Sequence, residues 1–258
     1  MTGLRSGIGL SALTLFALLT LYGCGVKGPL VLKGKPLPSA PGSPMVQQQG
    51  SDALLSWSIP TVNQDGTTLD NLKQFAIFRL PYHPGEYCSE CRDPSTGHIR
   101  IHLDHPEPAI RFENRIYLRD PDLPLNEGYR YRIIPLNSRD DLGADVVTHL
   151  VMFPAPQPPN EPEAIEYDRS LRIQWTAGTS QPDQGQWLGV NIYRAIGDEP
   201  FGLNPINSNP LTDDVYNDIG LENNQAYRYG LRNVIQINEQ IIESDLSAPV
   251  TATPKPLL

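Results

Sequence analysis

The sequence has no run of basic residues, and this absence excludes a large class of partners. Its 20 Lys and Arg are outnumbered by 29 Asp and Glu, which gives a formal net charge of −9. A chain with this balance lacks the electrostatic footprint of a nucleic-acid-binding protein. The same charge would repel anionic lipid, so any attachment to a membrane has to come from something other than surface charge.

Catalytic signatures are missing as well. No nucleophile elbow, phosphate loop, zinc-protease helix or calcium loop occurs at a recognisable spacing. The neighbouring carboxylates Asp140 and Asp141, like Asp213 and Asp214, would point to opposite faces of a strand or lie solvated in a turn. We therefore predict a chain that is not an enzyme, with no catalytic residue, metal or cofactor.

Helical periodicity is scarce, and turn-forming residues are abundant. No segment longer than a turn or two has apolar residues at helical spacing, whereas the chain contains 26 Pro and 21 Gly. The sequence predicts an all-β chain with little helix.

The N-terminal residues have the build of an export signal. Arg5 precedes residues 8–22, which carry no charge, and the run is shorter than the roughly 20 apolar residues that a spanning helix needs. Residues 21–24, Leu-Tyr-Gly-Cys, resemble the bacterial lipobox, in which the Cys is diacylated and becomes the mature N-terminus. The resemblance implies a signal peptide at residues 1–23 and palmitate-type acyl chains on Cys24. These chains would attach the protein to the membrane.

Residues 24–43 are rich in Pro and Gly and contain no aromatic residue. Such a segment cannot bury a core and stays extended. We predict a tether between the lipid and the folded part.

A strand pattern then occurs twice. Each copy has a segment that ends in Trp, a segment that ends in an aromatic residue followed by Arg, and a Leu before a Tyr-x-Tyr strand. The matching segments are residues 53–57, 75–79 and 123–133 in the first copy, and 171–175, 190–194 and 221–231 in the second. Apolar and polar residues alternate along the later segments, which predicts strands with one buried face. In the first copy, Tyr129 and Tyr131 should face the core, and Arg130 and Arg132 should face water.

These landmarks resemble the fibronectin type III module. The resemblance implies two tandem immunoglobulin-like β-sandwiches and a corner Tyr, Tyr129 or Tyr227, whose hydroxyl bonds to the backbone before its own strand. We expect the first sandwich at residues 44–154, a stiff Pro-rich linker at 155–161 and the second sandwich at 162–256.

The first copy is longer, and its extra residues fall near positions 81–108. They include Cys88 and Cys91, which are expected to form a disulfide in an exported protein. A redox pair and half of a metal site are the alternatives, the latter with ligands from His83, His98, His102 and His105.

Aromatic residues in the expected loops admit two interpretations. Each can mark a binding surface, or it can fold back onto its own sandwich. The residues are Tyr82, Tyr87, Trp187, Phe201 and Tyr216.

Together, these features predict a lipid-anchored envelope protein that acts as a non-catalytic binding or assembly module. Gly25 after the lipidated Cys resembles lipoproteins sorted to the outer membrane, and we expect the periplasmic face of that membrane. Residues 24–30 also resemble the start of small outer-membrane lipoproteins that assist the lipopolysaccharide-export barrel. This resemblance implies that Lys27, Gly28, Pro29 and Leu30 contact an outer-membrane β-barrel. The alternatives are a carbohydrate-associated accessory lipoprotein and a thiol-active or metal-active protein that works through Cys88 and Cys91.

Overall fold

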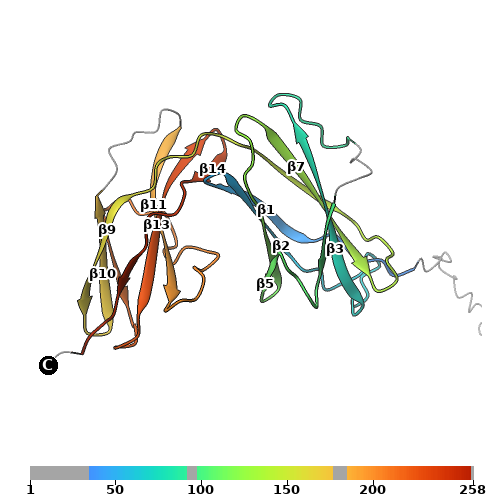
Figure 1. Cartoon of the computed structure of the whole chain (residues 1–258). Helices are drawn as coiled ribbons and strands as arrows, with labels where there is room; N and C mark the ends of the chain where they lie inside the picture. The colour runs from blue at the N-terminus through green and yellow to red at the C-terminus, as the bar shows by residue number, and fades with distance from the viewer. Residues whose placement is uncertain (1–34, 92–97, 177–184, 257–258) are drawn as a thin grey trace, which may run out of the picture. The chain divides into compact units, whose positions relative to one another are not determined.

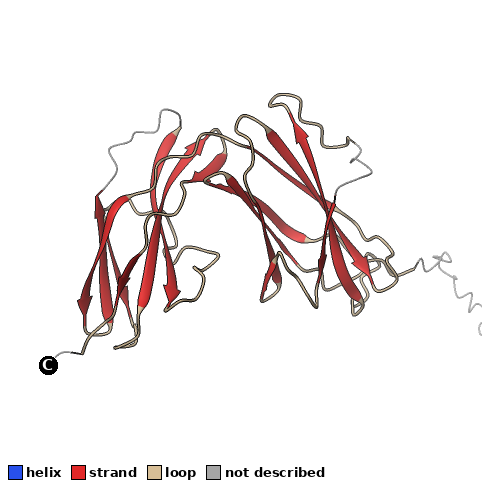
Figure 2. Cartoon of the chain, in the orientation of Figure 1, coloured by secondary structure: helices blue, strands red, loops and turns tan. Residues whose placement is uncertain are grey.

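The computed structural model describes residues 35–91, 98–176 and 185–256. Within these ranges all regular secondary structure is β-strand, as Figure 2 shows. The strands form two immunoglobulin-like sandwiches, so the predicted all-β class is confirmed. A search of the described residues for a helix with the length and hydropathy of a membrane span finds none.

The first sandwich packs two four-stranded antiparallel groups of strands face to face (Figure 1). One group has the order β1 (Gly42–Gln49), β2 (Asp52–Ser58), β6 (Arg115–Asp120) and β5 (Ile110–Phe112). The other has the order β4 (His98–His102), β3 (Leu72–Tyr82), β7 (Gly128–Asn137) and β8 (Val146–Val151). Trp57 lies at the centre of the core, with its ring edge-on to Phe75 at 5.5 Å between centroids. The core therefore forms around the first landmark Trp.

The second sandwich repeats this plan. A three-stranded sheet has the order β12 (Val215–Ile219), β10 (Ser170–Thr176) and β9 (Asn160–Tyr167). Opposite it, β11 (Gln186–Ile196) pairs with β13 (Tyr227–Ile237), and β13 also pairs with β14 (Gln240–Glu243) and β15 (Val250–Ala252). The first two segments of each copy lie within strands, and the Tyr-x-Tyr part of the third lies in β7 or β13, whereas residues 123–127 and 221–226 precede these strands.

Alternation along β10 explains its position. Leu171 and Ile173 are fully buried, and Trp175 is nearly so, while Arg172 between them is exposed. Burying such side chains stabilises a fold by about 1.5–3 kcal/mol each, and a shift of one residue would turn them all to solvent. The hydrophobic pattern therefore fixes the register of β10 against β9 and β12.

The first strand of each sandwich begins before the expected start of its domain. β1 begins at Gly42 and β9 at Asn160, slightly before the expected domain starts at residues 44 and 162. Farther back, Ala144 donates to the carbonyl of Pro38 at 2.9 Å, and Gln64 donates to that of Leu37 at 2.8 Å. The last residues of the predicted tether are thus bonded to the first sandwich.

One sheet continues from the first sandwich into the second. β14 pairs with β13 in a hairpin along one edge and in parallel with β1 along the other, with Gln48 opposite Ile242 and Gln49 opposite Glu243. The strand order is therefore β11, β13, β14, β1, β2, β6, β5 across both units, and Figure 1 shows β14 beside β1. A separate apolar group of Ile235, Ile237 and Ile242 lies at this junction, with Phe153 packed against it. The two sandwiches share main-chain hydrogen bonds and a small core.

Candidate functional site

The landmark residues of the repeat form the same polar group in each sandwich. In the first, Arg79 Nη1 donates to Asp120 at 2.7 Å, and the Tyr131 hydroxyl donates to the other oxygen of that carboxylate at 2.7 Å. Burial, with the nearby Asp120 charge, raises the pKa of Tyr131, so this hydroxyl stays protonated. The group binds strands of both sheets together.

The second sandwich has the equivalent contacts. Arg194 donates to Asp218 at 2.8 Å, and the Tyr229 hydroxyl donates to the same carboxylate at 2.7 Å. The predicted corner contact is also present here, since the backbone N–H of Glu222 donates to the Tyr227 hydroxyl at 3.1 Å. Because both copies use these residues to join strands, the groups are structural.

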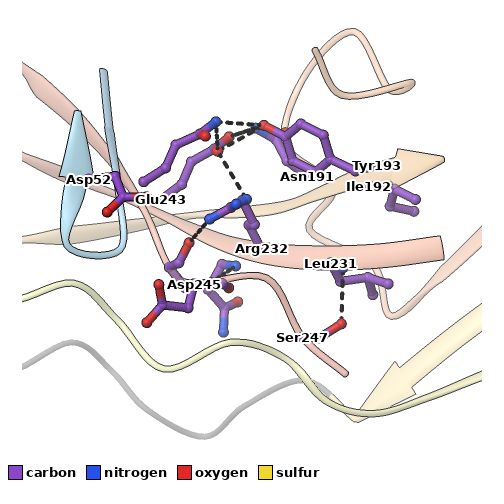
Figure 3. Close-up of polar contacts among 12 residues, drawn as sticks. Asp52, Asn191, Ile192, Tyr193, Leu231, Arg232, Glu243, Asp245 and Ser247 are labelled. Carbon is purple, nitrogen blue, oxygen red and sulfur yellow. Dashed lines mark hydrogen bonds and ion pairs between the residues drawn. The ribbon is translucent and has the colours of Figure 1, made fainter. Parts of the chain in front are cut away.

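A second polar group lies at the junction of the sandwiches. Glu243 is fully buried and accepts hydrogen bonds from Gln49, Asn191 and Tyr193, and Arg232 lies 3.8 Å from its carboxylate. Figure 3 shows Asn191, Tyr193 and Arg232 converging on Glu243. We call these five residues the junction cluster. A buried charge is tolerated only when it is paired and hydrogen-bonded, and here the donors come from both sandwiches.

The electrostatics of the junction cluster favour a structural role, in which it joins the two sandwiches. Burial lowers the pKa of Arg232, and the opposing effect of the neighbouring Glu243 charge is smaller. Burial, with the charge of Glu243, also raises the pKa of Tyr193 well above its usual value of about 10. With its hydrogen bonds and its ion pair joining strands of both units, the cluster holds the junction together.

Near the junction, two glutamine side chains each bond to the N–H and the carbonyl of one backbone residue, as a neighbouring strand would. Gln48 accepts from the N–H of Phe153 at 3.0 Å and donates to its carbonyl at 2.7 Å. Gln240 makes the same pair of bonds with Val151, at 3.0 and 2.8 Å. These contacts occupy backbone groups at the end of β8 that would otherwise be open to another chain.

The insertion of the first sandwich carries a disulfide above a buried cation. Cys88 and Cys91 are joined to each other. Beneath them, Arg130 is only 2% exposed and donates to the carbonyls of Ser89 at 2.9 Å and Cys88 at 3.4 Å. The prediction that Arg130 faces water is therefore wrong, because the inserted loop covers this part of β7. We call residues 83–91 the cysteine loop.

An aromatic surface adjoins the cysteine loop. Tyr87 stacks on His149 at 3.9 Å between ring centroids, and Tyr82 lies 5.3 Å from Tyr87. The Tyr82 hydroxyl lies 3.0 Å from His149 Nδ1. Partial burial lowers the pKa of His149 and raises that of Tyr82, the latter with a smaller contribution from Tyr87. Tyr82, Tyr87 and His149 form what we call the aromatic surface.

Two open clefts flank the aromatic surface. A cleft of about 590 Å³ lies under the cysteine loop and has Tyr82, Cys91, Pro124 and Arg130 among its lining residues. A groove of about 530 Å³ begins at His149 and runs between β1, β8 and the β13–β14 turn. Partly exposed aromatic side chains between two apolar hollows are typical of surfaces that bind other proteins.

The other aromatic residues predicted from loops fold back onto the protein. Trp187 and Tyr216 pack against the second core, and Trp187 Nε1 donates to Asn233 at 3.2 Å. Phe201 lies under the Arg228 guanidinium, 5.2 Å from it. Three of the five aromatic residues expected in loops lie in strands instead, because β3 and β11 extend beyond their landmark segments and β12 was not predicted: Tyr82 ends β3, Trp187 lies in β11 and Tyr216 in β12. Of the five, Tyr82 and Tyr87 are the two that form an accessible cluster with another aromatic side chain, His149.

The neighbouring carboxylates Asp140 and Asp141 hydrogen-bond to different side chains. Asp140 accepts from Gln74 at 2.8 Å, and Asp141 accepts from Asn137 at 3.2 Å, both in a turn between strands. Within the described ranges, no group of three or more His, Cys, Asp or Glu side chains is placed to hold a metal ion.

The predicted lipid and docking residues lie outside the described residues. They are Cys24, Lys27, Gly28, Pro29 and Leu30.

Sequence reasoning missed the junction cluster and the parallel pairing of β14. The sequence carries one local signal, since Asn238 and Glu239 separate two apolar runs. In the structure Asn238 has the positive φ, 55°, that such a turn requires. A two-residue turn of this kind is typical of a β-hairpin.

A scan against models of protein families finds no match, and a search of curated proteins finds none either. Among solved structures, the chain is similar to the FN1–FN3 domains of chicken CNTN1. The identity is 12% and the TM-score 0.33, over 86% of this chain and 69% of that one. The strand order of the two sandwiches defines the immunoglobulin-like fold.

Proposed function

We propose that this chain is a lipid-anchored protein of the cell envelope that acts as a non-catalytic binding or assembly module. The observation that carries the binding role is the aromatic surface with its two flanking clefts. Aromatic side chains supply much of the binding energy at protein interfaces, because they bury a large area with few rotatable bonds. The partner is then an envelope protein that covers Tyr87 and His149.

The junction supports this role by fixing how the two sandwiches present their surfaces. A hinge would cost affinity, since a partner that contacts both units would have to order them on binding. The shared sheet and the junction cluster remove that cost.

The lipid anchor is supported by sequence alone. Acylation of Cys24 and outer-membrane sorting follow from the lipobox and Gly25. In this proposal, Lys27 to Leu30 contact an outer-membrane β-barrel at the membrane surface, and the aromatic surface contacts a second partner.

Photo-cross-linking in intact cells tests the binding role. A photoreactive phenylalanine derivative is placed at Tyr87 and, as a matched control, at Tyr167, an exposed Tyr on β9 of the second sandwich. We expect a discrete cross-linked partner from position 87 and none in common with position 167. Identical products at both positions would contradict a binding role for the aromatic surface.

The anchor and the barrel contact are tested separately. Cys24→Ser should move the protein from the membrane fraction to the soluble fraction and remove the added mass of the acyl chains. Scrambling residues 27–30 should remove an outer-membrane barrel from pull-downs without affecting cross-links from position 87. If the barrel is retained, the role of these four residues is refuted.

A further inference from the structure

The Cys88–Cys91 disulfide lies where another thiol can reach it. Cys91 is exposed and Cys88 is half-buried, and the bond lines an open cleft. Its ring encloses only Ser89 and Glu90, so it removes little conformational entropy from the unfolded chain. Exposed disulfides are generally more easily reduced than buried structural ones. The bond therefore contributes little to global stability and is open to exchange.

The same short disulfide ring provides hydrogen-bond acceptors for the buried guanidinium of Arg130. Arg130 Nη1 donates to the carbonyls of Cys88 and Ser89, which both belong to the ring. A guanidinium that is 2% exposed depends on such acceptors, because burying a charge without them is costly. The disulfide holds these two carbonyls in place over Arg130.

We propose that Cys88–Cys91 is a thiol–disulfide exchange site and that its reaction partner is a dithiol. The two cysteines act as a two-electron switch. In the oxidised form the cysteine loop is closed over Arg130, and in the reduced form the loop is released.

The exchange follows from the exposure of the two sulfurs. A thiolate of the dithiol attacks the exposed Sγ of Cys91, the bond between Cys91 and Cys88 breaks, and Cys88 leaves as a thiolate. The second thiol of the partner then attacks its own sulfur in the mixed disulfide and releases Cys91. Two electrons and two protons pass from the dithiol to the cysteine pair, so the partner ends as a disulfide and the protein as two thiols.

Arg130 favours this direction of exchange. Its guanidinium contacts the backbone of Cys88, the residue whose thiolate leaves, and a neighbouring cation stabilises a thiolate and makes it a better leaving group. Glu86 and Glu127 line the same cleft, and their negative charges oppose this effect. His83 lies 3.6 Å from Glu127. The rate of reduction should therefore respond in opposite directions to loss of Arg130 and loss of Glu86.

Release of the cysteine loop would also alter the aromatic surface. Tyr87 directly precedes Cys88 and stacks on His149. Once the ring opens, Tyr87 loses the constraint on its C-terminal side, so the redox state of the pair controls how the aromatic surface is presented.

The first experiment measures accessibility of the bond in the folded protein. The mature chain carrying Cys24→Ser, which leaves only Cys88 and Cys91, is incubated with about 1 mM dithiothreitol and its thiols are trapped with a maleimide that adds mass. We expect two trapped thiols per chain within minutes in native buffer, with an unchanged far-UV circular dichroism spectrum. A bond that is reduced only after unfolding in urea would overturn the proposal.

The second experiment compares rates of reduction in variants. Glu86→Gln should speed reduction and Arg130→Met should slow it, each by roughly three- to tenfold, whereas Arg130→Lys should retain most of the wild-type rate. The pH dependence of Cys88 alkylation in a Cys91→Ser chain should move to higher pH when Arg130 is replaced by Met. Because Glu86 is exposed, its variant gives a result even if Arg130→Met does not fold. Equal rates for wild type and Glu86→Gln would overturn the electrostatic part of the proposal.

The third measurement tests the consequence for the loop. Hydrogen exchange is followed by mass spectrometry in residues 83–91, with residues 160–167 of β9 as the control segment in the same sample. Reduction should speed exchange in the loop at least several-fold and leave β9 unchanged. Equal protection of the loop in the two redox states would overturn its role as a switch.

Discussion

Gly128 shows how a missing side chain positions the aromatic surface. The ring of Tyr82 lies across β7 at this residue, and a Cβ added to Gly128 would stand 2.2 Å from Tyr82 Cζ. Only glycine leaves room for Tyr82 to reach His149 and the carbonyl of Leu150, to which its hydroxyl donates at 3.3 Å. The aromatic surface thus depends on a residue that carries no chemistry of its own.

Gly128→Ala should displace Tyr82 and destabilise the protein by about 1–3 kcal/mol, the usual cost of overpacking. Gly42→Ala is the matched control, because its Cβ would meet only Ser58 Cβ, at 3.6 Å, in another strand of the same sandwich. Urea unfolding followed by tryptophan fluorescence measures both. A Gly128→Ala protein as stable as Gly42→Ala would show that Tyr82 can move aside freely.

His149 gives a pH-dependent prediction at the same surface. Partial burial lowers the pKa of its imidazole, so the folded protein favours the neutral form more strongly than the unfolded chain does. Its contribution to stability is therefore present above the usual His pKa of about 6.5 and is lost as the pH falls below it. Titration by NMR should place the His149 midpoint below about 6.5.

The same NMR titration identifies which side chain shields His149 from water. Tyr87→Ala removes the ring stacked on His149 and should raise the midpoint toward its usual value, while Tyr167→Ala should leave it unchanged. No response to Tyr87→Ala would mean that other groups exclude water from His149.

At the scale of elements, β14 depends on Glu243. Replacing Glu243 with Gln keeps the size but removes the charge that faces Arg232, and the new amide group presents N–H donors to a site filled with donors. We expect Glu243→Gln to destabilise the protein by about 3 kcal/mol, as when one partner of a buried ion pair is removed. Urea unfolding provides the measurement.

An exposed ion pair supplies the control for Glu243. Glu166 accepts from Lys255 on the surface of the second sandwich, where water and salt screen the interaction. Glu166→Gln should therefore change stability far less than Glu243→Gln. Equal effects of the two substitutions would argue against a special role for the junction cluster.

The elements also show what could be predicted from the sequence. β10 and β13 were predictable because alternation of apolar and polar residues is a local property of a strand with one buried face. The burial of Arg130 was not, since its cover comes from the inserted cysteine loop rather than from its neighbours on β7. β14 has four residues, too few for a periodic pattern, and its partner β1 lies almost 200 positions earlier. Burial and pairing that depend on distant segments leave little trace in a local pattern.

At the scale of the whole molecule, the shared sheet makes the two sandwiches energetically dependent on each other. β1 pairs with β14, Ile235, Ile237 and Ile242 pack with Phe153, and the junction cluster takes donors from both units. If one sandwich unfolds, the other exposes this apolar group and leaves Glu243 without Gln49. Such coupling favours one cooperative transition over two.

Differential scanning calorimetry of the mature chain should therefore show a single transition whose van't Hoff and calorimetric enthalpies agree. Gln240→Ala removes two hydrogen bonds between the sandwiches, both to Val151, and Gln48→Ala removes two that hold Phe153 beside the junction core. The double variant should separate the transition into two or lower the ratio of the van't Hoff to the calorimetric enthalpy toward about one half. Gln236→Ala is the control, because its side chain bonds only to Asn238 in its own turn among the described residues. Two transitions in the unsubstituted protein would mean that the shared sheet forms without coupling the sandwiches, and the fixed presentation of the binding surfaces would then have to come from the Pro-rich linker.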